Sequence, residues 1–270
     1  MPKLTRAVPA EIFPATAERL TEWEADPEVL GVLLVGSKSV GHQDERSDDD
    51  LEVLLTDEGF DRLAPADCHT MRIEGEGSMR QIVYDAQLTS LSALEKKPSS
   101  SFDLDHWPYE RARVLFARDP QRVEAAVKAA GAMTPEFRAA RLAHGTIDAW
   151  VSAHRAGKTL ERGFQAAATL LVARSAKALV RVLFALESRW APLDHWLERE
   201  LETLDDPLRV GPRIVAALKE RRPTPLLEAL TSLENRLASE GVARATERRG
   251  LFLELIHAGR ADERGRHALP

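Results

Sequence analysis

Three consecutive aspartates, Asp48, Asp49 and Asp50, open an apolar stretch and are the residues in this sequence best suited to chemistry. Side chains alternate between the two faces of a strand, so Asp48 and Asp50 would point the same way and lie close together. Two carboxylates at such a separation repel each other unless a cation lies between them. Because Mg²⁺ is bound through oxygen ligands, the pair predicts a metal site.

A glycine and a serine, Gly36 and Ser37, follow an apolar run upstream of the aspartates. Backbone N–H groups at such a turn, together with a hydroxyl, can bind a phosphate, and Lys38 is a further candidate contact. Alone, an acidic run is typical of a solvated loop and a Gly-Ser pair of a simple turn. Their order and spacing instead favour a metal and a phosphate site on neighbouring strands, which is the equipment for phosphoryl or nucleotidyl transfer.

The segment from Val35 to Leu51 resembles the motif of the nucleotidyltransferases of the DNA polymerase beta superfamily, especially the small antibiotic-modifying and minimal bacterial members. Their pattern is a hydrophobic residue, Gly, then Gly or Ser, a spacer, and Asp-x-Asp or Asp-x-Glu followed by a hydrophobic residue. The resemblance implies that Asp48 and Asp50 bind Mg²⁺ and that Gly36 and Ser37 hold the phosphates of ATP or another nucleoside triphosphate.

The sequence departs from this pattern at Asp49, because the residue between the two carboxylates is usually apolar. A second register is therefore open, with Asp50 and Glu52 as the metal pair. The spacer length and the Ser-Asp-x-Asp-Leu context favour Asp48 and Asp50, with Glu52 as an outer or substitute ligand.

Asp85 lies in an alternating segment, RQIVYDAQL, that predicts a strand. An acid in mid-strand is unfavourable unless it faces water, a cation or a metal, and an exposed edge-strand acid is the simpler alternative. The resemblance implies a third carboxylate on a strand beside the aspartate pair. Asp85 would then orient or deprotonate the acceptor hydroxyl, as general base or metal ligand.

Arg174, Lys177 and Arg181 recur at offsets of three and four in an apolar segment that predicts a long helix. In a nucleotidyltransferase, Lys177 and Arg181 could neutralise the triphosphate. A charged stripe on an amphipathic helix is more commonly its solvated face.

The composition limits the class of protein. With 270 residues, the chain predicts one large domain or two smaller ones, and its net charge of −6 gives no basic field to attract nucleic acid. The single cysteine excludes an intramolecular disulfide and a cysteine-rich metal site. No segment has the pattern of a signal peptide or the apolar length of a membrane span, so we expect a cytoplasmic protein that does not bind membranes.

Elements alternate in type up to about Gly131 and are almost all helical afterwards. The expected class is α+β, with a small mixed-sheet nucleotidyltransferase domain over residues 1–132 and an α-helical bundle over 133–270. Thr134 as N-cap predicts a helix that Gly157 closes. The expected strands are Val29–Val35, Leu51–Leu55, and a hairpin formed by Met71–Glu76 and Met79–Ala86.

Together these features predict transfer of AMP from ATP to a hydroxyl group of a small molecule. A polycation of the aminoglycoside type would suit an acidic site, and the resemblance implies that the helical domain closes over the nucleotide. Two alternatives stay open: a toxin-neutralising nucleotidyltransferase that modifies a protein hydroxyl, and an inactive descendant that only binds nucleotide. The sequence does not indicate the oligomeric state.

Overall fold

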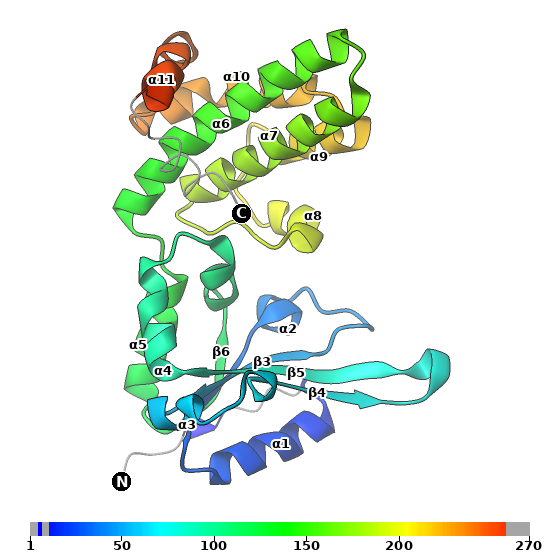
Figure 1. The fold of residues 1–270 in the computed structure, drawn as a ribbon, viewed down its shortest axis with the longest axis vertical. Coiled ribbons are helices and arrows are strands. Elements are labelled where there is room, and N and C mark those ends of the chain that lie inside the picture. Colours follow the sequence, from blue (N-terminus) through cyan, green and yellow to red (C-terminus); the bar gives the residue numbers. More distant parts are fainter. Residues whose placement is uncertain (1–4, 7–10, 258–270) are drawn as a thin grey trace. The chain divides into compact units, whose positions relative to one another are not determined.

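The computed structural model of the chain describes residues 5–6 and 11–257, and for residues 5–6 and 255–257 it describes the backbone alone. The chain divides into two compact units, one of Met1–Ser100 with Leu104–Ala132 and one of Ser101–Asp103 with Met133–Pro270. The first contains a mixed sheet with helices, and the second is helical, which confirms the α+β class (Figure 1). No helix among the described residues combines the length and apolar composition needed to cross a membrane.

The first unit is built on a six-stranded sheet with the strand order β1-β6-β2-β3-β5-β4. All neighbouring strands pair antiparallel except β3 and β5, which run parallel. The strands are β1 (Thr5–Arg6), β2 (Val29–Leu34), β3 (Asp49–Leu55), β4 (His69–Glu74), β5 (Gln81–Ser90) and β6 (Arg113–Ala117).

Helices cover both faces of this sheet (Figure 1). On one face, Leu20 and Trp23 of α1 join a core with β2, β3, β5 and β6. On the other face, α4 and α5 enclose a second core that includes Leu33 and Leu54. The helices of this unit are α1 (Pro14–Ala25), α2 (Gly36–Val40), α3 (Asp57–Asp61), α4 (Leu91–Lys96) and α5 (Pro120–Gly131).

The central position of β2 follows from its residues. It is apolar almost throughout, and Val32 and Leu34 pack on the α1 side while Leu33 packs on the α4–α5 side. A strand that is buried on both faces needs such a run, because neither face meets water. β3 lies beside it and is buried at every position except Asp50, which is half-buried.

The predicted hairpin is present with shifted bounds, since β4 begins two residues earlier than expected and β5 runs from Gln81 to Ser90. β5 extends past the start of β3, whose Asp49 pairs with Tyr84, so that the β4–β5 hairpin projects beyond the neighbouring strands (Figure 1). Gly75 has a φ of 82° near the tip, a left-handed conformation that glycine adopts without strain.

The second unit contains six helices in its described part, α6 (Pro135–Glu161), α7 (Gln165–Leu186), α8 (Leu197–Leu201), α9 (Val210–Glu220), α10 (Thr224–Ser239) and α11 (Ala245–His257). Thr134 caps α6 as expected, its hydroxyl accepting from Phe137 N–H. The predicted end at Gly157 is wrong, because α6 continues to Glu161. A glycine inside a helix costs about 1 kcal/mol, which the packing of α6 along α7 outweighs. Gly163, with a φ of 80°, is the left-handed residue that follows the helix.

Candidate active site

Gly36 lies directly against the carboxylate of Asp50. Directly after β2, the Val35 N–H donates to the backbone carbonyl of Asp50 at 2.9 Å. This hydrogen bond joins the C-terminal end of β2 to the start of β3. Gly36 then adopts a φ of 66° and begins the short helix α2, where the sequence had predicted a phosphate-binding turn. A Cβ atom at Gly36 would lie 1.9 Å from Oδ2 of Asp50. Only glycine allows this conformation and this approach, so the Gly-Ser segment and the aspartate strand form one site.

Asp50 and Asp85 are neighbours on parallel strands. They pair in register between β3 and β5, and residues in register project from the same face of a sheet. Asp48 lies two residues before Asp50 and one before β3. The structure thus brings together the three carboxylates that the sequence proposed as catalytic.

The electrostatics of Asp50 show that this arrangement is costly. Burial raises the pKa of Asp50 to about 7, and the charges of Asp48 and Asp85 add to the rise, although a hydrogen bond from the Ser37 backbone opposes it. Burial also raises the pKa of Asp48, where the charge of Asp85 again adds to the effect. Like charges gathered in a partly desolvated place favour either protons or a cation.

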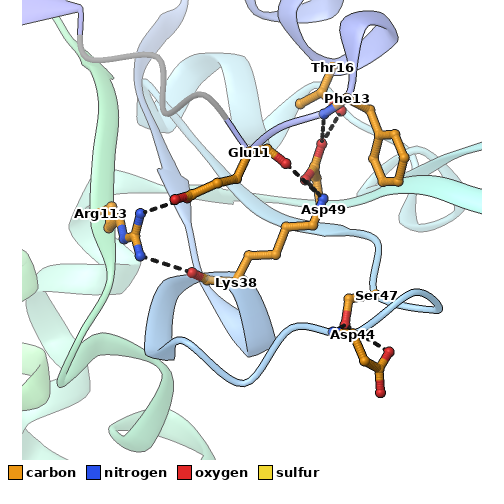
Figure 2. A network of polar contacts seen from close by, with 8 residues as sticks. All are labelled: Glu11, Phe13, Thr16, Lys38, Asp44, Ser47, Asp49 and Arg113. Carbon is orange, nitrogen blue, oxygen red and sulfur yellow. Dashed lines mark hydrogen bonds and ion pairs between the residues drawn. The ribbon is translucent and has the colours of Figure 1, made fainter.

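Asp49 points to the opposite side of β3 and is fully compensated there. Its Oδ2 accepts hydrogen bonds from the Phe13 N–H at 2.9 Å and from the Thr16 hydroxyl at 2.5 Å, and its Oδ1 lies 2.6 Å from the Lys38 ammonium (Figure 2). Asp49 is 0% exposed and Lys38 is 6% exposed. The departure from the motif is therefore a buried ion pair that links β3 to α1 and α2.

The Lys38 ammonium makes further contacts on this side of β3. Besides Asp49, it donates to the Glu11 carbonyl at 3.2 Å and lies 4.0 Å from the centre of the Phe13 ring. In this structure the ammonium neutralises Asp49, and its role as a phosphate contact stays a prediction. Gly36 and Ser37, by contrast, lie on the Asp50 side of the strand, where the Ser37 backbone bonds to that carboxylate.

Glu52, the alternative metal ligand, lies deeper along the same strand face. It is buried and accepts a hydrogen bond from the Tyr109 hydroxyl. Burial raises its pKa, which the nearby Lys97 and the Tyr109 hydrogen bond oppose. Because Tyr109 belongs to the core under α4 and α5, Glu52 is tied into that core and is less suited than Asp48 to share a metal with Asp50.

The carboxylate set suits a hard divalent cation without forming a complete cage. Among the described residues, no three His, Cys, Asp or Glu side chains are clustered so that they could hold a metal ion by themselves. Mg²⁺ is usually bound by one or two carboxylates together with phosphate oxygens of a substrate. Two mutually repelling carboxylates beside the Gly36–Ser37 backbone fit that kind of shared site.

The basic residues of α7 belong to the second unit and have carboxylate partners within it. Lys177 lies 3.1 Å from Asp194, and Arg181 lies 2.8 Å from Asp103. Arg181 is only 2% exposed, so the solvated-face interpretation is wrong for this residue. It is buried because Asp103, which also pairs with the buried Arg141, provides its counter-charge. Their role toward a triphosphate stays a prediction.

Two functional candidates were absent from the sequence prediction. Thr16 holds Asp49, and His69 contacts Asp85, with Nε2 2.5 Å from Oδ1. Neither contact has a local signal, since the partners are 33 and 16 residues apart in the sequence. Only the register of the β4–β5 hairpin, which the sequence leaves open, could have indicated His69.

No model of a known protein family matches this sequence, and no curated protein matches it either. Among solved structures, the chain is similar to a nucleotidyltransferase-like protein from Exiguobacterium sibiricum 255-15, with a TM-score of 0.43 and 16% identity, covering 84% of this chain and 74% of that chain. A similarity of this size assigns no activity, so the chemistry must be argued from the site itself.

Proposed function

We propose that the protein is a Mg²⁺-dependent nucleotidyltransferase that moves a nucleoside monophosphate, AMP from ATP, to a hydroxyl group of an acceptor. One observation carries the proposal: the Gly36 backbone rests on the carboxylate of Asp50, with Asp85 in register beside it. A phosphate-binding turn and an acidic face then meet at one point, as transfer of a phosphorus group requires.

In this proposal Asp48 and Asp50 hold the metal, and the phosphates of the substrate supply its remaining ligands. Mg²⁺, when bound, would polarise the α-phosphate and offset the charge of the triphosphate. The raised pKa of Asp50, about 7, supports this role, since a group that is costly to ionise alone gains most from a cation.

The remaining side chains would position the reactants. The Ser37 hydroxyl and the Gly36 backbone would bind the β- or γ-phosphate, which fixes the α-phosphate near Asp50. Asp85, with 37% of its side chain accessible, would take the proton from the acceptor hydroxyl.

The charge of the site favours a neutral or cationic acceptor. Three carboxylates lie together in a chain whose net charge is −6, and such a field attracts cations and repels anionic partners such as nucleic acid. A hydroxyl-bearing polycation of the aminoglycoside type is the acceptor class that fits best.

Nucleotide binding tests this proposal directly. Thermal unfolding would be followed with ATP, GTP, CTP and UTP, with and without Mg²⁺, on the wild type and on the double variant Asp48→Ala/Asp50→Ala. A ligand at a hundred times its Kd stabilises the native state by about 2.7 kcal/mol. We expect a clear, Mg²⁺-dependent rise in Tm for the wild type with ATP and none for the double variant.

Asp61→Asn is the matched control, because Asp61 is an exposed acid on α3 in the same unit. It should keep the full nucleotide shift. A wild type that no nucleotide stabilises would refute the proposal. A shift without any transfer to hydroxyl acceptors would instead identify a protein that binds nucleotide without chemistry, and transfer to a protein hydroxyl would identify a protein-modifying enzyme.

A further inference from the structure

His69 and Asp85 form a close pair at the exposed end of the proposed site. His69 is the first residue of β4, and its Nε2 lies 2.5 Å from Oδ1 of Asp85 on β5. In the antiparallel register, Asp85 is opposite Met71 and His69 is opposite Gln87. His69 therefore reaches Asp85 along the diagonal, a contact that long side chains make on one face of a sheet.

The register also connects this pair to the acids of β3. Asp85 is opposite Asp50, so His69, Asp85 and Asp50 lie in a row across three neighbouring strands. The two inner acids have raised pKa values that the charge of Asp85 helps to raise. Asp85 has a side-chain partner from outside the acidic cluster, the imidazole of His69.

Stability alone does not account for the pair. The side chains of His69 and Asp85 are 51% and 37% exposed, and ion pairs with such exposure contribute little to folding. The exposure instead makes the carboxylate accessible to an acceptor from solvent. A hydrogen bond that occupies one carboxylate oxygen also fixes the direction of the other.

We propose that His69 is a positioning residue for Asp85, an inference that rests on the proposed function. Its Nε2–H donates to Oδ1, and Oδ2 then accepts the proton of the acceptor hydroxyl. As that proton moves to Asp85, the acceptor oxygen forms a bond to the α-phosphorus. The bond from the α-phosphorus to the bridging oxygen breaks, and pyrophosphate leaves with the electron pair.

The test compares His69→Ala, His69→Gln and Asp85→Asn with the wild type. Release of pyrophosphate from Mg²⁺-ATP would be measured with kanamycin and with water as acceptors, and the nucleotide-dependent Tm shift would be measured separately. Water is included because hydrolysis of ATP to AMP and pyrophosphate needs no knowledge of the natural acceptor. Arg72→Ala is the control, since Arg72 is also on β4 but faces the opposite side, opposite Tyr84.

We expect His69→Ala to lower kcat by about ten- to a hundredfold, with KM for ATP and the Tm shift unchanged. His69→Gln should recover most of kcat, because its amide N–H can reach the same oxygen. Asp85→Asn should lower kcat by about 10²- to 10⁴-fold, and adding His69→Ala to it should cost nothing more, because the positioned group is gone.

Three results would overturn the inference. Equal kcat for His69→Ala and the wild type would remove His69 from the mechanism while leaving the proposed function intact. Loss of the nucleotide shift in His69→Ala would show that His69 acts on metal or nucleotide binding and not on the base. A wild type that shows no nucleotide shift, or binds ATP but never releases pyrophosphate, would remove the base together with the reaction it serves.

Discussion

Aspartates on the two faces of β3 have opposite electrostatic surroundings. On one face, Asp49 is fully buried and receives three donors, from Phe13, Thr16 and Lys38. On the other face, Asp50 meets the charges of Asp48 and Asp85, and its pKa rises to about 7. A buried acid with its counter-charge stabilises a fold, whereas an acid surrounded by acids is suited to bind a cation.

The largest effect should come from Asp50→Asn. If Asp50 binds Mg²⁺, the variant loses an interaction that contributes several kcal/mol to the transition state, which is a factor on the order of a thousand in turnover. Its fold should be kept and its metal-free stability at pH 7.5 should not fall, because a repulsive charge is removed. Steady-state transfer kinetics would measure the loss of turnover, and chemical denaturation would measure the stability. Unchanged turnover would show that Asp50 does not bind the metal.

Asp49→Leu should have the opposite signature. The substitution restores the apolar residue typical of the motif but leaves the Lys38 ammonium buried without its carboxylate, a change that typically costs about 3–5 kcal/mol. Denaturant unfolding would measure the loss. Lys38→Met in the same chain should restore most of the stability, because no uncompensated charge then stays buried. If the double variant were no more stable than Asp49→Leu alone, the unpaired charge of Lys38 would not be the cause of the lost stability.

The acids on the Asp50 face should make the stability of the protein depend on pH. The folded-state pKa values of Asp48, Asp50 and Glu52 are raised, so between about pH 4 and 7 the folded protein holds protons that the unfolded chain has lost. The metal-free protein should therefore lose stability as the pH rises through this window and level off above it.

Asp50 alone would account for a decrease on the order of 4 kcal/mol over the whole window, since its pKa rises from 3.8 to about 7 and each pKa unit corresponds to about 1.4 kcal/mol. The larger part of this decrease falls between about pH 5 and pH 7.5. Denaturation at pH 5 and pH 7.5 would measure this change, and Asp50→Asn should reduce it. Addition of Mg²⁺-ATP should stabilise the protein more at pH 7.5 than at pH 5, because a proton and the metal compete for the same carboxylate. A stability that rises with pH over this range would contradict the raised pKa of Asp50 in the folded protein.

The contrast between the faces explains what the sequence could predict. Alternation along a strand was enough to place Asp48 and Asp50 together, and the apolar run from Val29 identified β2. Asp49 was seen only as a departure, because its partners Thr16 and Phe13 come from α1, and no local pattern signals a contact with a distant helix.

Similar limits explain the other differences. The end of α6 was misplaced because two glycines, Gly157 and Gly163, offer the same local signal, and only the packing of the helix decides between them. The basic residues of α7 showed helical spacing correctly, but the burial of Arg181 depends on Asp103, which is 78 residues away. Spacing thus predicts which face a residue is on, and tertiary contacts decide what that face meets.

The smallest predicted effect compares two hydroxyl groups on either side of β3. Thr16→Val keeps the shape of the side chain but removes a hydrogen bond to the buried charge of Asp49, which should cost about 1.5–3 kcal/mol. Nucleotide affinity should not change, because this hydroxyl faces away from Asp50. Ser37→Ala should do the reverse, with a smaller loss of stability and an affinity for Mg²⁺-ATP reduced about tenfold, as expected for one lost hydrogen bond of about 1.4 kcal/mol to a charged phosphate.

Measuring both variants by denaturation and by nucleotide titration separates the two roles within a matched pair. If Ser37→Ala bound Mg²⁺-ATP as tightly as the wild type, the Gly36–Ser37 segment would serve only to seat Asp50. If Thr16→Val weakened the nucleotide, the two faces would be coupled through the β3 backbone. The compensated face would then contribute to the site by fixing the position of Asp50, since Asp49 and Asp50 share one stretch of chain.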